Sequence, residues 1–389
     1  MKLWSRQQTN ADSREDGALG ASVRSHMTYS FSQGGDNTAR MGSRQITMNN
    51  VQMLRGVAAC LVVLCHTIFL SGPLPTSVVH FSLACGFSGV ALFFVISGFI
   101  IAMKAAEGFE RKGRIIGAAE FAYNRVTRIY PLYWIVLVCA LVAALYLTGS
   151  PLENAQVTYP RLLLLLDACP PLGAAWTLKY EIYFYTLMTA VMMMGWGNLR
   201  RTLWVFVAVY AAVLAVAMYR PSSWFLASPY FLEFVFGVVV FIAIDAGWKL
   251  KGWIVLLIGA AGLVYGTYLI MDDPWGHDLL RPFALGVPSM VLVYGMICFE
   301  KTWRAPKIAV AIGDASYSIY LWHFAIMHQI YILNPPIYRS PFTTLATIVL
   351  MIAIGLVSYR YLEAPIGSLA SRLRRIAFTS PAVAVPSAL

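Results

Sequence analysis

Long apolar runs, separated by short stretches with Gly, Pro or charged residues, dominate the chain from residue 49 onward. A helix that crosses a bilayer needs about 20 mostly apolar residues. Ten runs fit, near residues 51–70, 84–103, 129–147, 174–194, 202–219, 227–245, 252–270, 281–299, 315–333 and 342–362. They lack the alternation of apolar and polar positions that marks the strands of a membrane barrel. The pattern predicts an all-α, polytopic membrane protein with about ten transmembrane helices.

The segments around these runs are polar or short. Residues 1–48 have too little apolar content to pack, so we expect a disordered cytoplasmic tail before a transmembrane domain at 49–366. This tail has no secretory-signal pattern, so the first apolar run should direct insertion. Residues 367–389 are expected to form a short basic cytoplasmic tail. The run at 161–172 is too short to cross, and we interpret it as an interfacial or re-entrant piece on the outer side.

Composition and charge agree with this interpretation. The chain is 59% hydrophobic and 12% charged, against roughly half and a quarter in soluble domains. Its net charge is +11, but the placement of the charge is more informative than the sum. If the N-terminus is cytoplasmic, 24 of the 29 Lys and Arg residues fall on the cytoplasmic side and four on the other. We therefore expect both termini in the cytoplasm, no nucleic-acid partner and, because the six cysteines lack metal-type spacing, no metal.

Two ionisable residues lie in the first apolar run. Arg55 and His66 are eleven positions apart, which places them on one helix face about 16 Å from each other along the axis. Histidine can take a proton from a hydroxyl, and the arginine fork suits phosphate. They therefore favour a phosphorylated cytoplasmic donor and a hydroxyl acceptor, joined by a polar channel past Ala59 and Val62. Alternatively, Arg55 snorkels to the headgroups and His66 is a hydrogen-bonded core residue.

A second basic group precedes the third run. Arg125 and Arg128 share a helix face near the Arg55 end of the membrane, at the end of a charged inner loop from 104 to 130. Most of the charge in this loop fits the ordinary excess of cations on the cytoplasmic side. We expect the arginine pair, which lies beside aromatic residues, to hold the phosphates of a ligand such as coenzyme A.

The fourth run begins WTLKYEIYFY and is expected to start near the outer face. Trp176 and Tyr180 could bind a sugar there or belong to an interfacial aromatic belt. Glu181 and Lys179 are two positions apart and do not face each other on a helix. Each therefore needs another partner or a cavity, and Glu181 is a candidate catalytic group.

Two later runs carry polar stripes. Ser316 and His323 lie on one face of the ninth run, with Tyr320 beside them, either in a site or as polar contacts between helices. In the last run, Arg360 and Glu363 are three positions apart and could simply pair with each other.

These segments together resemble the acyltransferase-3 family of bacterial membrane O-acyltransferases, and most closely its exopolysaccharide-modifying members. The resemblance runs from about Asn49 to Ile366. The matching segments are LRGVAACLVVLCH, GVALFFVISGFIIA, NRVTRIYPLYW, WTLKYEIYFY, SYSIYLWHF and YRYLEAPI. The resemblance implies ten helices and the transfer of an acyl group, usually acetyl from cytoplasmic acetyl-CoA, to a glycan hydroxyl at or beyond the outer face.

The family motifs map onto particular positions. The resemblance places the arginine and histidine of the first helix at Arg55 and His66, and the basic loop motif at Arg125 and Arg128. It places the late Glu-x-Pro signature at Glu363 and Pro365. Many members have a second basic residue where this chain has Asn124, and some carry an added soluble domain that this chain lacks.

We therefore expect a multi-pass O-acyltransferase of the bacterial inner (plasma) membrane, surrounded by membrane lipid. Its acceptor would be an extracellular or capsular polysaccharide or a lipid-linked precursor, and polysaccharide-assembly machinery would be a further partner. His66 would act as base or carry the acyl group, with Glu181 and His323 as further catalytic candidates. Trp176, Tyr180 and Ser316 would contact the acceptor. The alternative is a transporter or flippase whose buried charges form a substrate or proton path.

Overall fold

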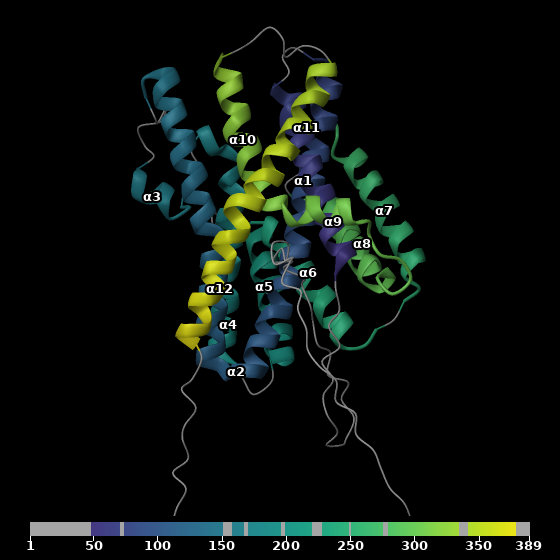
Figure 1. Cartoon of the computed structure of the whole chain (residues 1–389). Coiled ribbons are helices and arrows are strands. Elements are labelled where there is room, and N and C mark those ends of the chain that lie inside the picture. The colour runs from purple at the N-terminus through teal and green to yellow at the C-terminus, as the bar shows by residue number, and fades with distance from the viewer. Residues whose placement is uncertain are drawn as a thin grey trace, which may run out of the picture.

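The all-α prediction is confirmed by the computed structural model. It describes residues 48–70, 74–150, 158–166, 170–195, 199–219, 228–248, 250–274, 279–333 and 341–378, where all regular secondary structure is helical. The helices stand side by side in a bundle (Figure 1). The expected N-terminal tail, up to residue 47, lies outside the described residues.

Twelve α-helices and three short 3-10 or π segments make up the described bundle. The first half contains α1 (Asn49–Leu70), α2 (Thr76–Thr148), α3 (Tyr159–Leu163), η1 (Pro170–Ala175), α4 (Trp176–Met194), α5 (Leu199–Tyr219) and α6 (Tyr230–Asp245). The second half contains α7 (Gly252–Leu269), η3 (Pro282–Gly286), α8 (Val287–Phe299), α9 (Lys307–Asp314), α10 (Ser316–Leu333), α11 (Pro341–Ser358), η5 (Tyr359–Glu363) and α12 (Ala364–Phe378).

Several of these helices are long and apolar enough to cross a membrane. In the described part of the chain, five segments meet that requirement by length and composition. They are Asn49–Ile68, Thr76–Thr148, Gly252–Leu269, Pro282–Phe299 and Phe342–Phe378. The protein is therefore a multi-pass membrane protein. The remaining expected runs are also helical, as α4, α5, α6 and α10, but the count of ten spans stays a prediction.

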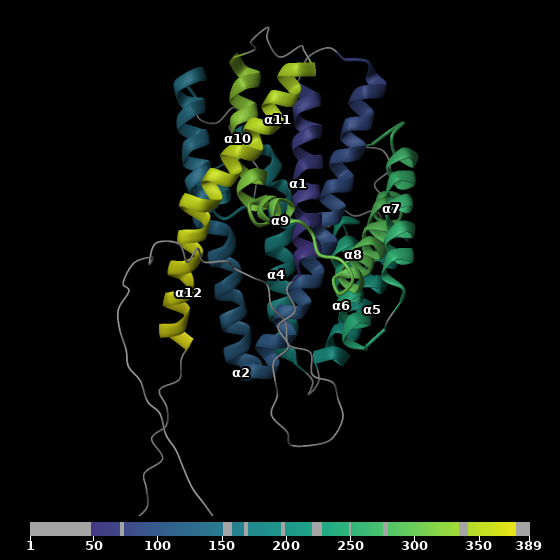
Figure 2. The same ribbon diagram turned by 45° about the vertical axis from the view of Figure 1, so that its right-hand side comes forward.

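The charged segment 104–128, which was expected to be a loop, is helical instead. It joins two predicted spans into α2, which reverses direction at Gly113. Gly113 has φ 73° and ψ −173°, a conformation that residues with a Cβ rarely adopt. The arms approach closely, because a Cβ on Gly117 would lie 2.6 Å from the carbonyl oxygen of Gly108. The two arms meet at the bottom of Figure 2.

The first arm of α2 forms the centre of the bundle. It crosses α6 at close range, because a Cβ on Gly98 would lie 2.0 Å from the carbonyl oxygen of Phe234. Small residues at such crossings allow membrane helices to pack backbone against backbone. The ring of Phe94 stacks on Phe234 with centroids 4.4 Å apart. The crossing therefore fixes the position of Phe94, which borders the site described below.

A remote carboxylate anchors the N-terminal end of α1. Glu300, directly after α8, accepts hydrogen bonds from the backbone N–H groups of Asn49 at 3.0 Å and Asn50 at 2.8 Å. The buried Asn50 amide donates to the carbonyl of Trp303 and accepts from the backbone N–H of Ala305. The first N–H groups of a helix have no partner within the helix. The segment after α8 supplies two of these partners.

The short run at 161–172 contains two brief helical segments, which agrees with its being too short to cross. α3 and η1 are separated by residues 167–169, which lie outside the described part. η1 packs on α10, where a Cβ on Gly173 would lie 2.7 Å from the ring of Phe324. The position of this piece relative to the membrane remains a prediction.

The described part of the expected C-terminal tail is also helical. α12 extends to Phe378 and lies along the second arm of α2 (Figure 1). The Tyr123 hydroxyl of that arm donates to the Ala370 carbonyl at 3.1 Å. Residues 379–389 lie outside the described part.

Candidate functional site

A cavity of about 100 Å³ lies between α1, α2, α4 and α10. Five residues expected to be functional border it: Arg55, Arg125, Arg128, Glu181 and Ser316. Ionisable groups inside membrane bundles are costly and mark functional sites by default. The structure therefore brings residues from four separate helices into one polar site within an apolar bundle.

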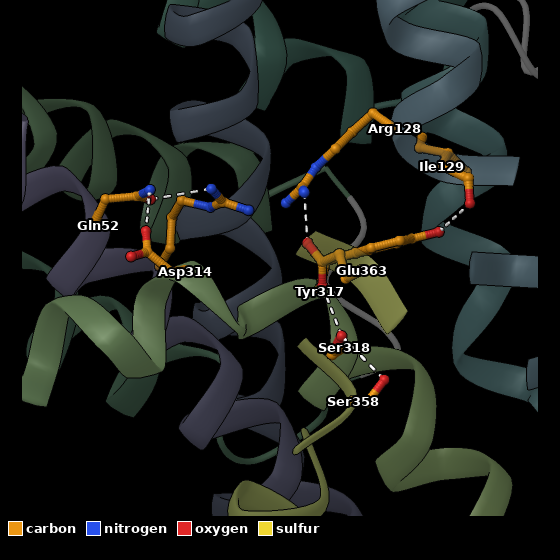
Figure 3. Close-up of polar contacts among 9 residues, drawn as sticks. Gln52, Arg128, Ile129, Asp314, Tyr317, Ser318, Ser358 and Glu363 are labelled. Carbon is orange, nitrogen blue, oxygen red and sulfur yellow. Dashed lines mark hydrogen bonds and ion pairs between the residues drawn. The ribbon is translucent and has the colours of Figure 1, made fainter. Parts of the chain in front are cut away.

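Arg55 is held by a relay of hydrogen bonds from another helix. Its Nη1 donates to Gln52 Oε1 at 3.0 Å, and Gln52 Nε2 donates to Asp314 Oδ1 at 2.7 Å. Figure 3 shows the contact between Gln52 and Asp314. The relay fixes the guanidinium at the cavity wall. This placement favours the ligand-binding interpretation of Arg55 over a snorkelling role.

Arg128 is paired with a buried carboxylate. Its Nη1 donates to Glu363 Oε1 at 2.5 Å, and the Ser318 hydroxyl donates to Glu363 Oε2 at 2.6 Å (Figure 3). The Arg128 guanidinium also lies over the Tyr317 ring, 5.5 Å from its centroid. Arg360 is exposed, so the alternative that it pairs with Glu363 is wrong.

Two polar groups in the cavity wall have no hydrogen-bond partner in the described part of the chain. Arg125 lies over the rings of Phe121 and Tyr185, 5.7 and 5.6 Å from their centroids, and its buried Nε is unpaired. The Ser316 hydroxyl is fully buried and also unpaired. Buried polar groups almost always have partners. These two atoms are therefore available to a ligand.

Glu181 lies in the arginine-lined cavity, whereas the sequence pattern placed it near the outer face. Its Oε1 accepts hydrogen bonds from Tyr185 at 2.5 Å and Ser97 at 3.4 Å. Thr177, Glu181 and Tyr185 share one face of α4, as their spacing predicts, and all three border the cavity. The carboxylate thus faces the same space as the three guanidinium groups.

His66 and His323 form a pair, with His323 Nε2 3.4 Å from His66 Nδ1. His66 Nδ1 also lies 2.9 Å from the Val62 carbonyl, and His323 Nδ1 lies 3.2 Å from the Ile319 carbonyl. A carbonyl oxygen only accepts, so both Nδ1 atoms are assigned the proton. The His66 Nδ1–H is then donated to the Val62 carbonyl, which is the closer acceptor, and His323 Nε2 lies farther from the same atom, at 3.4 Å. This assignment leaves His66 Nε2 as a proton acceptor.

Tyr320 separates the histidine pair from the cavity. Its ring borders the cavity and lies 5.6 Å from the His323 ring. Its hydroxyl donates to the Ala174 carbonyl at 2.5 Å and lies 2.5 Å from the Thr177 hydroxyl. Neither His66 nor His323 borders the cavity.

The face of α1 between Arg55 and His66 differs from the expected channel wall. Ala59 and Val62 are buried in apolar clusters, and Arg55 is the α1 residue that borders the cavity. Small apolar side chains on this face pack against neighbouring helices. The expected polar channel along this face of α1 is therefore wrong for the described residues, because the cavity at Arg55 is not bordered by His66.

The predicted sugar-binding aromatic residues do not border the cavity. Trp176 and Tyr180 pack on Tyr230, with ring centroids 5.0 and 5.2 Å away. Tyr180 also lies 6.2 Å from Phe94, which does border it. These rings therefore lie behind the residues that line the cavity, on the side away from it. Arg281, counted with the outer charges, is 2% exposed and donates to the Tyr230 hydroxyl at 2.6 Å.

The partners that position the arginines were not predicted from the sequence. Gln52 is three positions before Arg55, a spacing that could have indicated contact on a helix. Glu363 was identified from the late Glu-x-Pro signature and as a partner of Arg360, but not as a partner of Arg128. Asp314 carries no comparable signal, because its contact with Gln52 joins positions 262 residues apart.

The fold and the cavity define a multi-pass membrane protein with a buried, arginine-rich site. A family model described as "Acyltransferase domain" matches residues 48–360. The chain belongs to this acyltransferase-3 family, so it is an acyltransferase, as the sequence resemblance implied. The transporter alternative is not supported by this assignment.

Curated relatives agree with the family. "Exopolysaccharide production protein ExoZ" of Rhizobium meliloti (strain 1021) is 29% identical over 315 residues, covering 74% of this chain and 90% of that protein. "Acyltransferase MdmB" of Streptomyces mycarofaciens is 26% identical, covering 74% and 81%. "Putative O-acetyltransferase SACOL0978" of Staphylococcus aureus (strain COL) is 23% identical, covering 72% and 52%. No solved structure matches the chain.

Proposed function

We propose that this membrane O-acyltransferase moves an acetyl group from cytoplasmic acetyl-CoA to a hydroxyl of an extracellular or capsular polysaccharide, or of its lipid-linked precursor. The names of two relatives, one for exopolysaccharide production and one for O-acetyl transfer, support this substrate class. The family itself supports an acyl donor such as acyl-CoA.

One observation carries the proposal: three arginines and a carboxylate share a small cavity, and the wall residue Tyr320 lies between this cavity and a histidine pair. Arginine forks suit the phosphates of a coenzyme A thioester. The unpaired Nε of Arg125 offers a further donor. A histidine with a free Nε2 suits the deprotonation of an alcohol.

In the proposed reaction, His66 Nε2 takes the proton of the acceptor hydroxyl while the oxygen attacks the thioester carbonyl carbon. A C–O bond forms and the C–S bond breaks. The proton held by His66 then passes to the departing coenzyme A thiolate. The Val62 carbonyl accepts the His66 Nδ1–H and orients the ring, as a third group does beside a general base, and His323 packs next to it. Glu181 lies where it can orient the reacting groups in the cavity.

The proposal includes a topology and a location. Ten spans with both termini in the cytoplasm place the arginines toward the donor side of a bacterial inner membrane. The acceptor then approaches the histidine pair from the other side, with Ser316, Trp176 and Tyr180 as contacts for the glycan. Polysaccharide-assembly machinery would deliver that glycan.

The test measures transfer to glycan in membranes that contain the full-length protein. Membranes receive radiolabelled acetyl-CoA, and the label in the glycan fraction is compared with membranes without the protein. His66→Gln should lower the rate by about 10² to 10⁴. His80→Gln is the matched control, because His80 lies at the start of α2 and does not border the cavity. Arg125→Ala should raise the donor KM more than it changes acceptor affinity.

Three outcomes would count against the proposal. Absence of glycan labelling by well-inserted wild-type protein would exclude this donor and acceptor pair. Near-normal transfer by His66→Gln would remove the general-base role from His66. A donor KM that is unchanged in Arg125→Ala would mean that this arginine only contributes to the excess of positive charge on the cytoplasmic side.

A further inference from the structure

A second pocket, of about 540 Å³, lies where the bend of α2 meets the end of α12. Four cations and one carboxylate line it: Arg111, Lys112, Arg374 and Arg375 around Glu120. The functional proposal above does not use this pocket. The expected inner loop places it on the cytoplasmic side.

The carboxylate organises the cations but does not balance them. Glu120 is 5% exposed, and its oxygens lie 3.1 Å from Lys112 Nζ and 3.7 Å from Arg374 Nε. Arg111 adds a third ion pair at 3.5 Å. The charged lining residues carry a formal charge of +3. Such an excess attracts an anion, and arginine forks favour phosphate.

One wall of the pocket is flat and apolar. The ring of Phe378, the last residue of α12, lies 5.8 Å beneath Lys112 Nζ, and Lys112 donates to the Phe378 carbonyl at 3.1 Å. Ile116 adds an exposed apolar surface. Nucleic-acid bases stack on aromatic side chains in this way. The pocket therefore combines features that suit a phosphate and a base.

The size and position of the pocket suit the donor. At about 100 Å³ the arginine-lined cavity is too small for a nucleotide, whereas about 540 Å³ falls within the 300 to 1,000 Å³ typical of ligand pockets. Glu120 and Arg125 are five positions apart on the second arm of α2, a rise of about 7.5 Å and a turn of about 140°, so the donor must pass around this helix as well as along it. An extended pantetheine arm can bridge that gap.

We propose that this pocket binds the phosphate-bearing nucleotide end of the acyl-CoA donor. The pantetheine arm then follows the second arm of α2 and brings the thioester into the cavity beside Arg125. This inference rests on the proposed function, because it assigns a second part of the donor to a separate pocket.

Binding measurements test the proposal without an acceptor. The purified full-length protein in phosphatidylcholine nanodiscs is titrated with coenzyme A and with dephospho-coenzyme A, which lacks the 3′-phosphate. Wild-type protein should bind coenzyme A about tenfold more tightly, because a charged hydrogen bond is lost with the phosphate. Arg374→Ala and Arg375→Ala should remove this preference. Arg372→Ala, at an exposed arginine outside the pocket, should retain it.

A further variant separates charge from docking of α12. Arg374 also pairs with Glu120, so its loss could release the helix. Tyr123→Phe removes the hydrogen bond to the Ala370 carbonyl without changing the charge of the pocket. It should keep the preference for coenzyme A, whereas loss of the preference in this variant would contradict the charge argument.

The remaining outcomes separate this inference from the proposed function. If wild-type protein binds coenzyme A and the preference survives in Arg374→Ala and Arg375→Ala, the nucleotide site is wrong and the proposed function stands. The two substitutions could weaken binding only in nanodiscs that contain anionic phosphatidylglycerol, and by the same factor for coenzyme A and dephospho-coenzyme A. In that case the pocket binds lipid headgroups and the inference is overturned. If wild-type protein does not bind coenzyme A at all, the proposed donor itself is wrong.

Discussion

Replacing Glu363 tests whether its contact with Arg128 positions the donor site. The Glu363 side chain is 4% exposed and binds Arg128, whose side chain is 35% exposed. A hydrogen bond between charged groups contributes about 1.5 to 3 kcal/mol. Water can reach Arg128, so we take the lower end. Glu363→Gln should therefore lower the free energy of unfolding by about 1.5 kcal/mol.

The same change should weaken donor binding. An Arg128 guanidinium that is free to move should raise the donor Kd about tenfold, the equivalent of about 1.4 kcal/mol. Coenzyme A binding and thermal unfolding in detergent measure the two effects. The donor KM should rise while kcat changes little, because Glu363 acts through Arg128 and not on the reacting atoms.

Glu107→Gln is the matched control for this experiment. Glu107 pairs with Lys104 at 2.7 Å on the same helix as Arg128, but at a partly exposed position. Exposed pairs contribute about 0 to 1 kcal/mol, so this variant should resemble wild type. Wild-type stability and donor binding in Glu363→Gln would refute the positioning role.

Further predictions concern packing, the tyrosine wall and topology. Gly98→Ala should destabilise the protein by about 1 to 3 kcal/mol in thermal unfolding, because its Cβ meets a backbone carbonyl, whereas Gly367→Ala, with open space around it, should be neutral. Tyr320→Phe should cost about 1 kcal/mol and spare transfer, and a hundredfold loss of transfer at normal stability would instead place the hydroxyl at the reacting atoms. An impermeant thiol reagent applied to intact cells should label a cysteine at Asp273 but not one at Arg111, and the reverse result would overturn the topology.

Spacing within a helix could be predicted because helical geometry fixes which side chains share a face. The stripe of Thr177, Glu181 and Tyr185 does face one cavity. Apolar run lengths likewise located most helices to within a few residues, but α2 extends well beyond the two runs that predicted it. The orientation of that stripe toward the arginines could not be predicted, because it depends on how separate helices pack.

Contacts between separate helices and unusual backbone conformations could be predicted less well from the sequence than spacing within one helix. Arg128 and Glu363 are 235 residues apart, and nothing within either helix specifies the partner. The segment 104–128 looked like a loop because it is charged, yet charge indicates solvent exposure and not the absence of a helix. A single glycine, Gly113, allows the reversal with helix on both sides.

The anchor of α1 has a consequence for the order of synthesis. The carboxylate of Glu300 that binds the first N–H groups of α1 is 250 residues downstream of Asn50. At about 5 to 20 residues per second, a ribosome needs about 12 to 50 s to make that stretch. Throughout this interval α1 lacks its anchor, so a nascent chain that stops before residue 300 leaves the first turn of α1 without its native partner. The N-terminal end of α1 therefore gains these native hydrogen bonds only after α8 and Glu300 have been synthesised.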